Sequence, residues 1–113
     1  MELKRTNPDS FVVLGNAVEA ETMRLAMTQP ANQGPREDEP RARAHERLRL
    51  PAVTDPWEAR LSHIELIALQ RAVSNMQYQT HVFDADHRTQ AATLTQQFIE
   101  QGKAPENRIY FSY

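Results

Sequence analysis

The amino-acid sequence predicts a mainly α-helical protein, and the spacing of its apolar residues is the main observation behind that prediction. Apolar side chains recur at helical intervals in three segments, at about residues 10–28, 56–79 and 86–101. Most of the seven prolines precede Trp57 and interrupt the region between the first two segments. We therefore expect three parts: an N-terminal helical arm over 1–28, a linker rich in proline and charge over 29–55, and a helical domain with a short extended tail over 56–113.

The first predicted helix covers about residues 10–28. Ser10 is a suitable N-cap, and the apolar run Phe11–Leu14 is continued at helical spacing by Val18. Gly15 lies inside this segment and costs a helix about 1 kcal/mol relative to alanine. The same apolar run is equally compatible with a short strand. Either conformation leaves an apolar face that needs a partner.

The linker over 29–55 combines prolines with closely mixed charges, a composition that does not by itself offset the entropy of ordering. We interpret its basic stretch Arg41–Arg49 as a solvated run of charge, with an arm that orders on another surface as the alternative. The whole chain has a formal net charge of -2 and a pI near 6.1, which argues against sequence-independent binding to nucleic acid. We therefore expect no nucleic-acid partner.

The longest predicted helix covers about residues 56–79. Asp55 is a suitable N-cap, Pro56 fits the first helical position, and Glu58 lies where a capping-box acid reaches back. Apolar residues cover so much of this helix that we expect burial from two sides, one of them against another protein. The residues that we assign to this interface are Trp57, Leu61, Ile64 and Leu66 of the helix, with Tyr110 and Phe111 of the tail.

The second helix of this domain is expected to begin at a cap formed by Asp84 or Asp86. Gly102 should end it, because a C-terminal glycine can take the left-handed conformation. The last residues, 108–113, have the composition of a strand but no sequence neighbour with which to pair. We expect this tail to lie on a partner or to pack against the helices.

The sequence does not contain an established catalytic or metal-binding motif. The densest set of potential metal ligands is His81, Asp84, Asp86 and His87. Their spacing is not that of a known zinc site, and helix capping explains them better. The chain has no cysteine and only three glycines, which removes thiol chemistry and a glycine-rich phosphate loop. We expect no catalytic site, metal or cofactor on this chain alone.

Localisation and assembly follow from similar considerations. The lack of cysteine fits a reducing compartment, and neither a signal peptide nor a long apolar run is evident, so we expect a cytoplasmic protein without membrane association. The two helices of the last part offer few large apolar side chains to offset the entropy of ordering. We therefore expect a protein partner or a homo-oligomer.

The segment from Pro51 to Arg60 resembles the Pro-Val-Phe-x-Glu-Pro-Trp-Glu-Ala-Arg segment of beta subunits and activator proteins in the nitrile hydratase and thiocyanate hydrolase family. Phe83–Arg88 resembles the family's turn into its next helix, and Tyr110–Tyr113 resembles the start of its Tyr-rich segment. The resemblance, which covers about residues 51–113, implies a beta-like or activator subunit docked on an alpha subunit that supplies a cysteine claw for cobalt or iron. It also implies that Arg88, one position out of register, corresponds to an arginine that contacts the oxidised cysteine ligands.

A second class of protein fits the same features without the resemblance. A scarce core, a long arm and an adhesive C-terminal strand suit a small helical structural or assembly protein of a larger particle, viral or part of a secretion machine. An independent enzyme is the third class.

Overall fold

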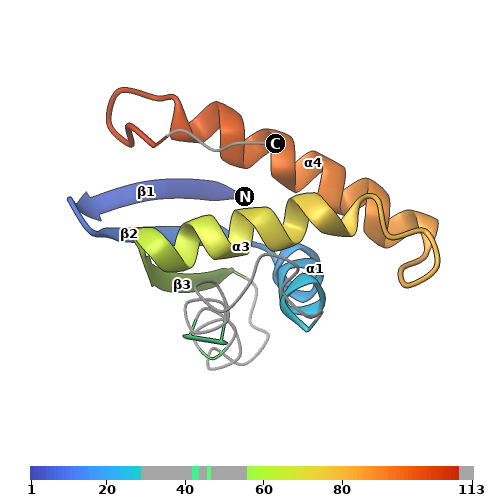
Figure 1. The fold of residues 1–113 in the computed structure, drawn as a ribbon. Helices are drawn as coiled ribbons and strands as arrows, with labels where there is room; N and C mark the ends of the chain where they lie inside the picture. Colours follow the sequence, from blue (N-terminus) through green and yellow to red (C-terminus); the bar gives the residue numbers. More distant parts are fainter. Residues whose placement is uncertain (29–41, 44–45, 47–55, 110–113) are drawn as a thin grey trace.

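The computed structural model describes residues 1–28, 42–43, 46 and 56–109. Within these residues, an antiparallel sheet of order β1-β2-β3 packs against three helices, α1, α3 and α4 (Figure 1). Helix α3 contacts the other two helices and the strands β2 and β3, whereas α4 also runs beside β1. The prediction of a mainly α fold is wrong, because the protein belongs to the α+β class.

The N-terminal part is a β-hairpin followed by a helix, so the predicted helix over 10–28 is wrong in its first half. Strand β1 (Glu2–Asn7) pairs antiparallel with β2 (Ser10–Gly15), and α1 (Ala17–Met27) follows. The alternative of a short strand at Phe11–Leu14 is confirmed. The physical reason is tertiary: a neighbouring strand satisfies the backbone of this apolar run, and Asn16 then caps α1 through a capping box.

The predicted helix over 56–79 is also wrong in its first part, which forms β3 (Trp57–Ser62) beside β2. Helix α3 (His63–Met76) begins only after Ser62, whose side chain accepts a hydrogen bond from the Glu65 N–H. The Glu65 carboxylate in turn accepts from the Ser62 N–H at 2.8 Å, which completes a capping box. The predicted cap Asp55 lies outside the described residues, and Glu58 is a strand residue.

Helix α4 (Ala85–Gly102) confirms the predicted helix over 86–101 and its cap. The Asp84 carboxylate accepts from the His87 N–H at 2.8 Å. Gly102 is the last helical residue, but the cap residue that follows, Lys103, has a right-handed φ of -72°, so the helix does not end through a left-handed glycine. Beyond the helix, Arg108 has a positive φ of 50°, and the Ile109 N–H returns to the Gly102 carbonyl at 2.8 Å. The predicted interface residues Tyr110 and Phe111 lie outside the described residues.

One hydrophobic cluster joins all six elements. Each element contributes at least one buried side chain: Leu3 from β1, Phe11 from β2, Met23 from α1, Trp57 from β3, Leu69 from α3 and Phe98 from α4. The N-terminal hairpin and α1 therefore share a core with the segment that follows the proline-rich region. This core contains more apolar side chains than two helices alone provide, so the number of core residues expected from the sequence is too low.

Candidate interaction surface

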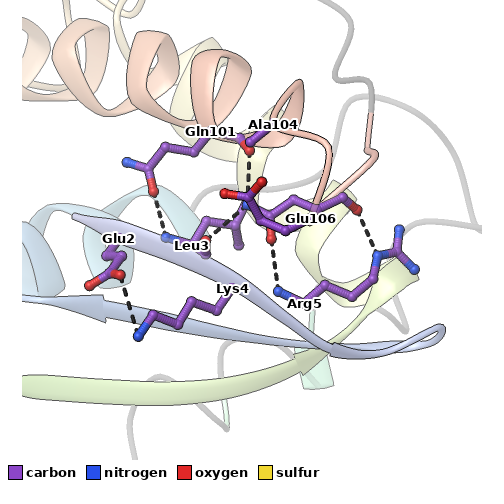
Figure 2. Close-up of a pocket in the computed structure, with 8 residues that line it drawn as sticks. Glu2, Leu3, Lys4, Arg5, Gln101, Ala104 and Glu106 are labelled. Atoms are coloured by element: carbon purple, nitrogen blue, oxygen red, sulfur yellow. Dashed lines mark hydrogen bonds and ion pairs between the residues drawn. The ribbon is translucent and has the colours of Figure 1, made fainter.

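Two carboxamide side chains from the C-terminal part of the chain close the outer edge of β1. Figure 2 shows one of them, Gln101, beside Leu3. Gln101 accepts a hydrogen bond from the Leu3 N–H at 2.6 Å and donates to the Met1 carbonyl at 2.7 Å. Asn107 accepts from the Arg5 N–H and donates to the Leu3 carbonyl, both at 2.9 Å. These amides occupy the positions that the backbone of a further strand would take.

The loop that carries Asn107 is held firmly against the hairpin. The Asn107 side chain is 2% exposed and also donates to the Gln101 carbonyl at 2.8 Å. The Arg5 guanidinium donates to the carbonyls of Asn107 and Pro8, at 2.6 and 2.5 Å, and lies 4.6 Å from the centre of the Phe11 ring. Arg5 thus fastens the loop to the hairpin turn, and its donors are used by the protein itself.

The outer edge of β3 differs, because the sheet ends there within the described residues. In an antiparallel strand the N–H and C=O of one residue point the same way, and successive residues alternate. The backbone groups of Leu3 point outward, to Gln101 and Asn107. Its partner on β2, Val13, therefore directs its own backbone groups away from β1 and bonds to Ala59 on β3. The backbone groups of Glu58 and Arg60 therefore point away from the sheet.

Ser62 supports this alternation and marks the end of the open edge. Its N–H also points outward, but there it is taken by the Glu65 carboxylate of the capping box. Beyond it, the His63 N–H donates to the Asp9 carbonyl of the hairpin turn at 3.0 Å. Within the described residues, the open edge of β3 thus consists of the backbone of Glu58 and Arg60.

The sheet face that points away from the core carries opposite charges in an ordered pattern. Glu2 and Glu58 flank Leu14 in one row across the sheet, and Lys4 and Arg60 flank Val12 in the next. Within each outer strand the charges pair weakly: Lys4 lies 3.4 Å from Glu2, and Arg60 lies 3.8 Å from Glu58. The Arg60 side chain is 77% exposed, so its guanidinium can reach a neighbouring molecule.

The structure separates the predicted interface residues. Trp57, Leu61 and Leu66 lie in the chain's own core with at most 2% exposure, whereas Ile64 is 59% exposed on α3. The Trp57 Nε1 is buried and has no hydrogen-bond acceptor in the described structure. From the sequence, Glu58 is assigned to a helix cap, so Glu58 and Arg60 are both missed as residues of a sheet edge. The alternation of apolar and charged side chains over Trp57–Leu61 was the available signal.

Two of the four potential metal ligands named from the sequence are in contact in the structure. Asp84 and His87 lie together, with the His87 Nδ1 at 2.8 Å from the Asp84 carboxylate. The hydrogen bond from the His87 backbone N–H is the main cause that holds the pKa of Asp84 below its ordinary value. Among the described residues, no group of three potential ligands could hold a metal ion. Arg88 donates to the Phe83 carbonyl at 3.2 Å, so it braces the turn before α4.

Two hollows of the described surface are also lined by polar residues. One, of about 380 Å³, lies beside the closed edge of β1, and its amide groups bond to the hairpin backbone (Figure 2). The other, of about 230 Å³, lies between α1 and α4 around Val18, Gln90 and Thr93. In the second hollow, the Thr93 hydroxyl donates to the Thr89 carbonyl of its own helix, and the Glu19 carboxylate pairs with the N-terminal amino group. In the described part of the chain, no helix is both long and apolar enough to span a membrane.

Comparison of the chain with protein-family models, curated proteins and solved structures finds no match. Function is therefore inferred from the contrast between the two sheet edges.

Proposed function

We propose that this chain is a non-catalytic protein that binds another protein chain by accepting an added strand at the edge of β3. The single observation that carries the proposal is the difference between the two edges of the sheet. At β1, the side chains of Gln101 and Asn107 satisfy the outward backbone groups of Leu3 and Arg5. At β3, the outward groups of Glu58 and Arg60 have no such partner among the described residues.

Strand addition is the recognition mode that this edge favours. An added strand obtains affinity from main-chain hydrogen bonds and specificity from side chains on alternate positions. Charges on an edge strand ordinarily discourage pairing. Here the two charges have opposite signs and lie on the same face, so a strand that sets a basic residue opposite Glu58 and an acidic residue opposite Arg60 would be attracted, and one with like charges at these positions would be repelled.

The experiment compares Arg60→Pro with Arg60→Ala. Proline removes the outward N–H without breaking a bond to β2, because edge strands tolerate proline at such positions. Alanine removes the charge and keeps the N–H. Tagged full-length variants are purified from the native host, and the co-purifying chains are quantified by mass spectrometry and mapped by hydrogen exchange.

We expect wild type and Arg60→Ala to recover the same partner chain. In wild type, the Glu58 and Arg60 amides should exchange more slowly with the partner bound than without it. Arg60→Pro should lose that partner but keep the unfolding curve of wild type. Recovery of an unchanged partner by folded Arg60→Pro would refute the proposal.

The link to nitrile hydratase-type enzymes stays a prediction. The matched residues Trp57–Arg60 lie in a strand, whereas we expected them at the start of a helix. A neighbouring gene that encodes a Cys-x-x-Cys-Ser-Cys claw, together with cobalt or iron in the purified complex, would support that role. Neighbouring genes for shell or tail components would support the role in assembly of a larger particle.

A further inference from the structure

We infer that the strand added to β3 belongs to a second copy of this chain, paired antiparallel about a two-fold axis at Ala59. The inference rests on the proposed function, because it names the occupant of the same edge. In a two-fold symmetric dimer, both copies use the same surface patch. When that patch is a sheet edge, the two edge strands are antiparallel. The edge then needs a sequence that is complementary to itself.

The backbone of β3 meets that requirement. With the axis at Ala59, Glu58 of one copy lies opposite Arg60 of the other, and Arg60 lies opposite Glu58. Both residues direct their N–H and C=O groups outward, so each facing pair exchanges both of its backbone hydrogen bonds. This pairing therefore satisfies the outward N–H and C=O groups of Glu58 and Arg60 in both copies.

The side chains select this register over its neighbours. Glu58 and Arg60 stand on the same sheet face, and residues directly opposite in an antiparallel pair lie within reach of one another. The axis at Ala59 therefore places a carboxylate beside a guanidinium twice. An axis at Glu58 sets two carboxylates together, and an axis at Arg60 sets two guanidinium groups together. Only the central register brings opposite charges face to face at both positions.

The remaining charges on this face continue the pattern. The acidic row of one copy, which holds Glu2 and Glu58, runs into the basic row of the other, which holds Arg60 and Lys4. Between the charges lie Val12, which is 8% exposed, and the partly buried Leu14. In the joined sheet, each Leu14 is flanked by two acidic residues and each Val12 by two basic residues.

Sedimentation of the full chain tests the register through its charges. We expect wild type to dimerise. Arg60→Glu and Glu58→Arg should each raise the dissociation constant of the dimer by about tenfold or more, because each sets like charges opposite one another. A mixture of these two variants should form heterodimers, since every facing pair is then attractive. The double variant Glu58→Arg/Arg60→Glu should dimerise as wild type does. Lys4→Glu is the matched control, because it changes a charge on the same face beside the closed edge and should leave dimerisation unchanged.

Engineered cysteines give a second measurement that does not depend on charge. The chain has no cysteine of its own, so any disulfide formed is the intended one. Hydrogen-bonded facing residues have Cα atoms about 5.5 Å apart, which suits a disulfide. We expect a mixture of Glu58→Cys and Arg60→Cys to cross-link under mild oxidation far more than either variant alone.

A wild-type chain that sediments as a monomer overturns the inference. So does a dimer whose dissociation constant does not change in the charge variants, or cysteine variants that each cross-link alone as well as they do in the mixture. If the chain is monomeric and Arg60→Pro still loses a native partner, the inference fails and the proposed function stands. If Arg60→Pro retains that partner, the proposed function itself fails.

Discussion

Asn107→Ala should destabilise the protein strongly, although Asn107 lies in a surface loop after the last helix. The substitution removes the acceptor for the Arg5 N–H and the donor to the Leu3 carbonyl. The carbonyl is buried and the N–H is partly buried, and an unpaired buried group costs about 1 to 3 kcal/mol. With the N–H at the lower end of that range, the loss in free energy of unfolding is about 2 to 4 kcal/mol. A domain of this kind has about 5 to 15 kcal/mol in total.

Urea unfolding measures this loss, with the fluorescence of the only tryptophan, buried Trp57, as the signal. Glu106→Ala is the matched control, because Glu106 is an exposed residue of the same loop. Asn107→Asp tests the mechanism, since it keeps an acceptor for the Arg5 N–H but sets a carboxylate against the Leu3 and Gln101 carbonyls. We expect Asn107→Asp to be destabilised as well.

The result that would refute this reasoning is an Asn107→Ala midpoint and slope equal to those of Glu106→Ala. The closing amide would then contribute nothing to stability, and the contrast between the two sheet edges would lose its physical basis.

Substitutions at three further residues test other parts of the fold. Ser62→Ala removes the cap of α3 and should lower the free energy of unfolding by about 1 kcal/mol in urea titration. Because the pKa of Asp84 is lowered on folding, its contribution is complete above its ordinary pKa and is lost as the pH falls through the lowered value. Asp84→Asn should therefore remove this part of the acid sensitivity, seen as a flatter dependence of the urea midpoint on pH below about 4. Trp57→Phe should cost less than about 1.5 kcal/mol by thermal unfolding, because it removes a buried donor without an acceptor, whereas Trp57→Ala should cost about 3 to 5 kcal/mol.

Helix α4 could be predicted from the sequence because every local signal agrees. Asp84 supplies the cap, apolar residues recur at core spacing, and Gly102 lies at the end, so propensity and pattern give the same answer. No distant part of the chain has to be known for this element.

The error at β3 came from two signals that conflict. Asp55-Pro56 is a strong helix start, and the apolar run that follows suits a helix, so the alternation in Trp57–Leu61 was given too little weight. A second start signal, Ser62 followed by Glu65, lies a few residues further on and is the one that the protein uses. Only pairing with β2, which local sequence does not show, decides between them.

The closed edge could not be predicted from the sequence at all. Gln101 and Leu3 are 98 residues apart, and Asn107 and Leu3 are 104 apart, so no local spacing connects them. A glutamine in a helix and an asparagine in a loop are ordinary surface residues by composition. Their role arises only once the C-terminal loop is folded against the hairpin.

The short length of the open edge gives it specificity rather than strength. The Ser62 N–H is bonded within its capping box, so among the described residues of β3 only Glu58 and Arg60 present backbone groups to a partner. Such a short edge is a poor template for unselective aggregation, which favours long, flat and uncharged strands. A partner must therefore match both the backbone register and the order of the two charges. In the proposed dimer, one rotation axis meets both conditions, so the same two residues that discourage other strands would favour a second copy.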